Sequence, residues 1–82
     1  MENATQTFYM AEISEEFQAL IPERERFATG AIAATPEEAQ RFLDFKCAVY
    51  MAVVRRLGLV DRVPENMGRV AKLHHTSIPA GV

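Results

Sequence analysis

The chain has 82 residues, of which 49% are apolar and 24% are charged, and its formal net charge is −2. A chain of this length forms one domain, because two halves would each be too small to bury a core. The ordinary composition excludes a disordered chain. The slightly negative net charge and the lack of a long basic block argue against binding to DNA or to an anionic membrane surface.

The compartment is indicated by the single cysteine, Cys47. Small secreted domains usually depend on disulfides, so one cysteine favours a reducing compartment. The first residues include acids but no basic segment of the kind that begins a secretory signal. The longest apolar run covers residues 47–54, whereas a membrane-spanning helix needs roughly 20 residues. We therefore expect a cytoplasmic protein.

The first part of the chain predicts an arm followed by a short helix. Residues 1–12 read as an extended or turn-like arm. Ser14 is a good N-cap, and apolar residues then recur at helical spacing up to Ile21, which predicts a helix over 15–21. Pro22 ends or kinks this helix, and a second segment continues to about residue 29.

The clearest helix begins at Thr35, which provides an N-cap hydroxyl before Pro36 at the first helical position. Apolar residues then follow the spacing of one helical face. The helix ends with two arginines in its last turn and Gly58, which can adopt the left-handed conformation. These signals predict a helix over 36–57.

The sequence pattern therefore predicts an all-α fold. The segments 15–29 and 36–57 form an antiparallel helical hairpin within residues 14–58 of a single domain. The arm of residues 1–12 precedes it. A C-terminal extension, residues 59–82, includes either a short helix over 64–74 or only a tail.

The middle of the long helix, residues 47–54, is apolar on every face. Either the remaining chain encloses this helix, or it forms a subunit interface, and both interpretations stay open here. The second predicts a homo-oligomer or a complex with another protein. Its interface residues would be Phe42, Phe45, Val49, Tyr50, Met51, Val53 and Val54.

No residue pattern predicts catalysis, a metal or a cofactor. His74 and His75 are the only histidines, and adjacent residues point in different directions. Cys47 lies in an apolar run, where a thiol behaves as a small hydrophobe. The chain has no glycine-rich phosphate loop, nucleophile elbow or metalloprotease helix.

One pattern allows ligand binding. Residues 23–26 alternate in charge sign, which is typical of a solvated helix surface. Alternatively, Arg24 or Arg26 can combine with Phe8 or Tyr9 into a clamp for a phosphate-bearing base.

Two stretches resemble the small phage proteins that sequester cyclic oligonucleotides and so block the CBASS defence. Phe8 with the run Ile-Ser-Glu-Glu at 13–16 resembles the start of that family's first helix, and the run Tyr-Met-Ala-Val-Val-Arg at 50–55 resembles the end of a later one. The resemblance covers residues 8–57. It implies a helical hairpin that assembles into an oligomer with cyclic nucleotides at its subunit boundaries. The implied ligand contacts are Phe8, Tyr9, Arg24 or Arg26, and Arg55.

These observations lead us to expect a non-enzymatic, oligomerising binding protein of the phage-accessory type, which acts as an inhibitor or sequestering protein against host defence. The alternative is a structural or accessory subunit of a larger protein assembly.

Overall fold

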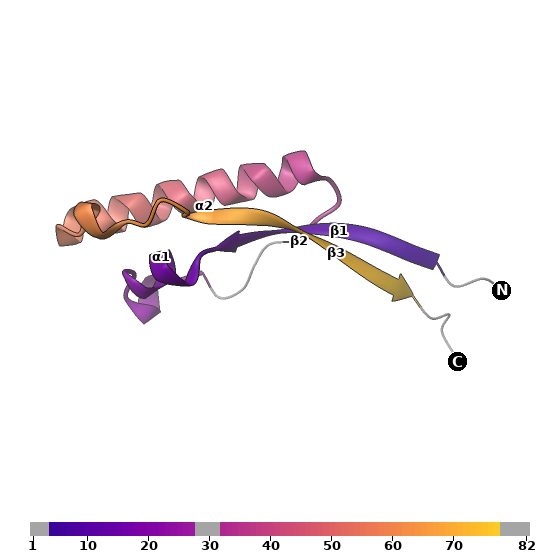
Figure 1. Cartoon of the computed structure of the whole chain (residues 1–82), viewed down its shortest axis with the longest axis horizontal. Helices are drawn as coiled ribbons and strands as arrows, with labels where there is room; N and C mark the ends of the chain where they lie inside the picture. The colour runs from indigo at the N-terminus through magenta and orange to yellow at the C-terminus, as the bar shows by residue number, and fades with distance from the viewer. Residues whose placement is uncertain (1–3, 28–31, 78–82) are drawn as a thin grey trace.

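The long helix lies where the sequence pattern predicts it. In the computed structural model, which describes residues 4–27 and 32–77, helix α2 spans Pro36–Leu57 (Figure 1). The Thr35 hydroxyl accepts a hydrogen bond from the Glu38 N–H at 3.2 Å. Gly58 has φ 71°, a left-handed conformation that ends the helix, and its N–H donates to the Arg55 carbonyl. Local capping chemistry is thus sufficient to define both ends of α2.

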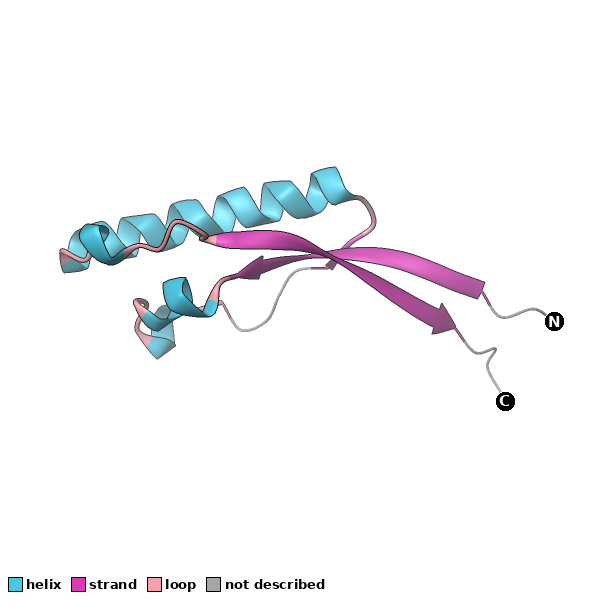
Figure 2. Cartoon of the chain, in the orientation of Figure 1, coloured by secondary structure: helices cyan, strands magenta, loops and turns pink. Residues whose placement is uncertain are grey.

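The all-α prediction is wrong, because both ends of the chain form strands. Strand β1 spans Ala4–Ile13 and strand β3 spans Gly68–Ser77. They pair antiparallel over ten residues, from Ala4 opposite Ser77 to Ile13 opposite Gly68. The short strand β2, Ile32–Ala33, pairs with the other side of β1, so the strand order is β2-β1-β3 (Figure 2).

The predicted arm, hairpin and C-terminal helix are corrected accordingly. Most of the arm at 1–12 is β1, and β3 replaces both the proposed helix at 64–74 and the start of the tail. Residues 28–29 of the first hairpin segment and residues 78–82 of the tail lie outside the described residues. No helical hairpin forms, because the long helix packs along a sheet over one half of its length.

The sequence pattern around Gly68 shows why the C-terminal prediction failed. Met67, Val70, Ala71 and His74 fit helical spacing equally well, and only tertiary contacts decide between helix and strand. A Cβ at residue 68 would collide with the Glu12 carbonyl oxygen and would lie 2.8 Å from the Leu43 Cδ1. The glycine thus allows β3 to approach β1 and α2 closely.

Helix α1, Glu15–Ala19, follows β1 directly and is capped by the Ser14 side chain, which accepts from the Phe17 N–H at 3.2 Å. Two short 3₁₀ turns complete the described chain: η1 at Glu23–Glu25 and η2 at Val60–Arg62. The predicted helix start at Ser14 is confirmed, but the helix is two residues shorter than 15–21.

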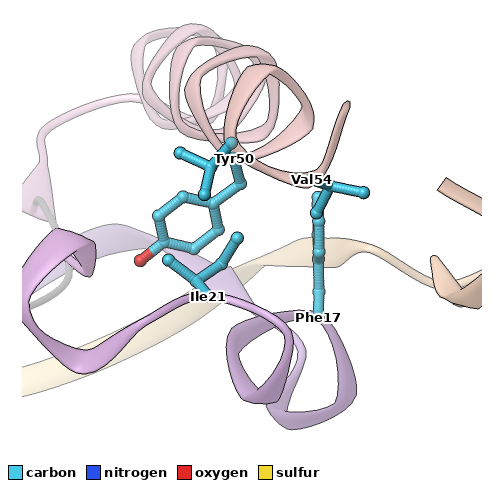
Figure 3. Close-up of a cluster of buried hydrophobic side chains, with 5 residues drawn as sticks. Phe17, Ile21, Tyr50 and Val54 are labelled. Carbon is cyan, nitrogen blue, oxygen red and sulfur yellow. The ribbon is translucent and has the colours of Figure 1, made fainter. Parts of the chain in front are cut away.

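The core lies between the second half of α2 and the α1–η1 segment. Figure 3 shows Tyr50 and Val54 of α2 facing Phe17 and Ile21 from the opposite side. All four side chains are buried, and the Phe17 and Tyr50 rings meet edge to face at 5.7 Å. The first half of α2 packs on the sheet instead, through Ala39 and Leu43. Helix α2 therefore connects the α1–η1 segment, against its second half, to the sheet, against its first half.

Candidate interaction surface

The two faces of the sheet differ in what covers them. Ala11 and Ala33 are buried on the face of the sheet toward α2. Residue 68 lies on the same face, because a Cβ there would contact Leu43 of α2. Because side chains alternate along a strand, their neighbours in sequence point to the opposite face. We call this second side the helix-free face, since within residues 4–27 and 32–77 the only helix that packs along the sheet is α2.

The helix-free face is apolar in its centre. The register places Ile32, Met10 and Ala71 in one row across the three strands, and Phe8 beside Leu73 in the next row. Ile32 is 60% exposed, although isoleucine is among the residues most often found fully buried. The residues of this face are Phe8, Met10, Ile32, Ala71 and Leu73.

One ion pair borders this apolar patch. Glu12 and Arg69 are directly opposite in the β1–β3 register, and the Arg69 Nε lies 3.1 Å from a Glu12 carboxylate oxygen. The pair is exposed, so it contributes only tenths of a kcal/mol. It closes one end of the patch with balanced charge, as expected for the rim of an interface.

Sequence reasoning missed most of this face. Met10, Ile32, Ala71 and Leu73 were not among the predicted interface residues. Phe8, Met10 and Glu12 are spaced two residues apart, which places their side chains on one side of a strand. This spacing could have indicated that they share a face. The partner strand lies some 60 residues away in the chain, so no local pattern could reveal the shared row.

The residues that were predicted to form a subunit interface divide into three groups. Tyr50, Val53 and Val54 are buried inside the chain's own core. Phe42, Val49 and Met51 are half-buried. Phe45 is 61% exposed, with its ring centroid 6.1 Å from that of Phe27.

The five predicted ligand contacts are not brought together. Phe8 and Tyr9 are adjacent in β1 and therefore point to opposite faces of the sheet. Arg24 and Arg26 lie in and directly after η1, and the Arg26 Nε donates to the Ile21 carbonyl at 2.8 Å. Figure 1 shows η1 and the last turn of α2, which holds Arg55, at the end of the molecule away from the chain termini. The clamp of aromatic and guanidinium groups is therefore not formed within this chain.

Arg55 instead lines an open groove of about 550 Å³ between α2 and residues 65–68. Leu43, Cys47 and Met51 contribute apolar surface, while Asp44 and Glu65 contribute carboxylates. Burial, and then the nearby Asp44 carboxylate, raise the pKa of the Cys47 thiol. The groove thus holds a thiol that stays protonated, which is the inert form of cysteine.

Among the residues whose burial is described, the most deeply placed cation is Lys46, which is 7% exposed on the inner side of α2. Its Nζ lies 5.4 Å from the centroid of the Phe27 ring, a cation–π distance. Burial lowers the pKa of this lysine. The aromatic contact partly replaces the hydration that the ammonium group loses on burial.

In residues 4–27 and 32–77, no three His, Cys, Asp or Glu side chains are grouped so that they could hold a metal ion. Among the helices of this described part, none combines the length and apolarity needed to cross a membrane.

Comparisons of the chain with protein-family models, with curated proteins and with solved structures found no match. The fold implied by the phage-protein resemblance, a helical hairpin, differs from the helix-on-sheet arrangement described above.

Proposed function

We propose that this protein is a non-enzymatic binding protein that works as an assembly of identical copies and acts on its target by occupying it, as an inhibitor or sequestering protein. The single observation that supports the assembly is the helix-free face of the sheet. Two rows of apolar side chains cross it, and among the described residues no helix packs along it. Ile32 is 60% exposed, and the other four side chains are half-buried. A second copy of the chain is the proposed cover.

The shape of the molecule supports a second copy as the occupant. The radius of gyration is 16.0 Å, against about 12 Å for a compact domain of this length. The accessible surface is 6023 Å², against about 4,900 Å² for a folded monomer of this mass. The excess of about 1,100 Å² is comparable with the ~800 Å² that each partner buries in a standard interface. A second copy seated on the helix-free face would bury part of this surface.

The charge at the edge of the face is compatible with self-association. The Glu12–Arg69 pair carries no net charge, so a second copy does not bring like charges against the apolar rows. An interface with an apolar centre and a paired polar rim is typical of homodimers.

The oligomeric mass tests the proposal. Light scattering coupled to size-exclusion chromatography is expected to give at least twice 9.2 kDa at micromolar concentration. The variants Ile32→Glu and Leu73→Glu place a charge on the helix-free face and should shift the mass toward that of the monomer. Ala48→Glu, on the exposed side of α2, makes a matched change elsewhere and should leave the mass unchanged.

A wild-type mass of 9.2 kDa over the whole concentration range would overturn the assembly. An oligomer that survives both glutamate variants would remove the helix-free face as its interface. Circular dichroism of each variant separates loss of assembly from loss of folding.

A further inference from the structure

Strand β3 is a long edge strand with one open side. It pairs with β1 along its whole length of ten residues and with no other strand in the described part of the chain. The backbone N–H and C=O groups on its outer side therefore have no strand partner there. Such an edge is a template for another extended chain, and natural proteins usually keep edge strands short or charged.

The charges of β3 are all positive. Residues 68–77 include Arg69 and Lys72 but neither aspartate nor glutamate. Both cations are exposed, and they lie on opposite faces of the sheet because their positions differ by three, an odd number, along the strand. Arg69 uses only its Nε toward Glu12, so the guanidinium retains further donors for a second acceptor.

These charges disfavour a second copy at this edge. Two β3 strands placed side by side would bring together two Lys72 ammonium groups and two Arg69 guanidinium groups, of which only the guanidinium groups are balanced by Glu12. A register that sets like charges opposite one another destabilises a strand pair. An acidic strand has the reverse effect, since each opposite-charge pair adds roughly 0.2–1 kcal/mol. Ala71 and Leu73 lie on the helix-free face next to Lys72 in the sequence, and they favour apolar residues opposite them in a paired strand.

We propose that the open edge of β3 binds an extended acidic peptide segment of a partner protein, which adds as a fourth strand with carboxylates opposite Arg69 and Lys72. Main-chain hydrogen bonds supply affinity in this mode, and the alternating side chains supply specificity. The site goes beyond the proposed assembly, because it uses the edge of the sheet and leaves its helix-free face uncovered.

The probe is a fluorescein-labelled peptide of sequence Thr-Thr-Val-Glu-Val-Thr-Glu-Thr. Run antiparallel to β3, it places its two glutamates opposite Lys72 and Arg69 and its two valines opposite Leu73 and Ala71. A second peptide with lysine in place of both glutamates is the control. Fluorescence anisotropy with the full chain should show the acidic peptide binding at least about fivefold more tightly at 50 mM salt, with a smaller ratio at 300 mM.

Protein variants test the location of the site. Lys72→Glu should reduce or reverse the preference for the acidic peptide. Arg62→Glu, an exposed cation in η2 away from the sheet, changes net charge equally and should keep the preference. Both residues are exposed, so both variants are expected to fold. Ile32→Glu should break the assembly and still bind the acidic peptide, which separates this proposal from the previous one.

Backbone methylation tests the mode of binding. Two versions of the acidic peptide carry N-methyl groups on alternate sets of residues, and only one set faces β3 in a strand pair. One version should lose binding and the other should retain it. Equal affinity of the acidic and basic peptides, equal effects of the two methylated sets, or no binding of either peptide at 1 mM would each overturn the proposal.

Discussion

The phenolic oxygen of Tyr50 accepts a hydrogen bond of 2.9 Å from the backbone N–H of Phe27, and the two rings stack with centroids 5.4 Å apart. Tyr50 is fully buried in α2, whereas Phe27 follows η1 and is half-buried. This contact joins the long helix to the segment that covers its second half. It is a buried polar link inside an otherwise apolar core.

Tyr50→Phe should therefore destabilise the protein by about 1–2 kcal/mol, since it removes the acceptor and leaves a partly buried N–H without a partner. A loss of this size lowers the melting temperature by roughly 4–16 °C in a domain this small. Thermal unfolding followed by circular dichroism, at one protein concentration throughout, measures it. Tyr9→Phe is the control, because the described residues offer its hydroxyl no hydrogen bond, and it should change little. Equal effects of the two variants would contradict the role of the Tyr50 hydroxyl.

Gly68→Ala should lower the free energy of unfolding by about 1–3 kcal/mol, because the new Cβ pushes the Glu12 backbone and the Leu43 side chain away from residue 68. Chemical denaturation measures the free energy of unfolding. Gly58→Asn is a useful contrast. A Cβ at residue 58 meets nothing within 4 Å, and asparagine tolerates the positive φ better than other residues. We expect the variant at residue 68 to be the more destabilised, and the opposite order would contradict the close packing of β3.

Cys47 should react slowly with iodoacetamide in the native protein. Its pKa is raised by burial and by Asp44, so little thiolate is present at pH 8. We expect labelling, followed by mass spectrometry, to be slower in the native protein than in denaturant. Asp44→Asn should accelerate it modestly by removing the nearby negative charge. A native rate equal to that of the unfolded chain would show that the thiol is not protected.

The Glu25–Arg56 pair predicts a pH dependence. The hydrogen bond from Arg56 lowers the pKa of Glu25, so the charged carboxylate is favoured in the folded state. Its contribution to stability is present above the unfolded pKa of about 4.3 and disappears as pH falls through the lower, folded value. The effect is small because the pair is exposed to solvent.

Thermal melts of wild type and Glu25→Gln should accordingly differ at pH 6, and the difference should shrink as the pH falls toward 3. Glu65→Gln makes the same change at an exposed carboxylate for which the described residues provide no ion pair, so it is the control for the loss of one negative charge. A constant gap for Glu25→Gln between pH 6 and pH 3 would contradict the role assigned to the pair.

Local chemistry in the sequence was sufficient to predict helix α2 and the start of α1. Thr35, Pro36 and Gly58 act on backbone groups within four residues of themselves, so the ends of α2 follow from short-range hydrogen bonding. The same holds for Ser14 at the start of α1. Apolar spacing also indicated which side of α2 is buried, since Leu43, Tyr50 and Val54 all belong to that periodic set.

The sheet was decided only by the tertiary structure. Phe8 faces Leu73, and Met10 faces Ala71, across 60 or more residues of chain. A strand has no hydrogen bonds within itself, so β1 and β3 form their ladder only by pairing. Taken alone, the sequence of β1 is compatible with an extended arm and that of β3 with a helix or a tail. The candidate site depends on the same pairing: the helix-free face is a row of side chains from three strands, and the edge of β3 is defined by which strand lies beside it and which side remains open.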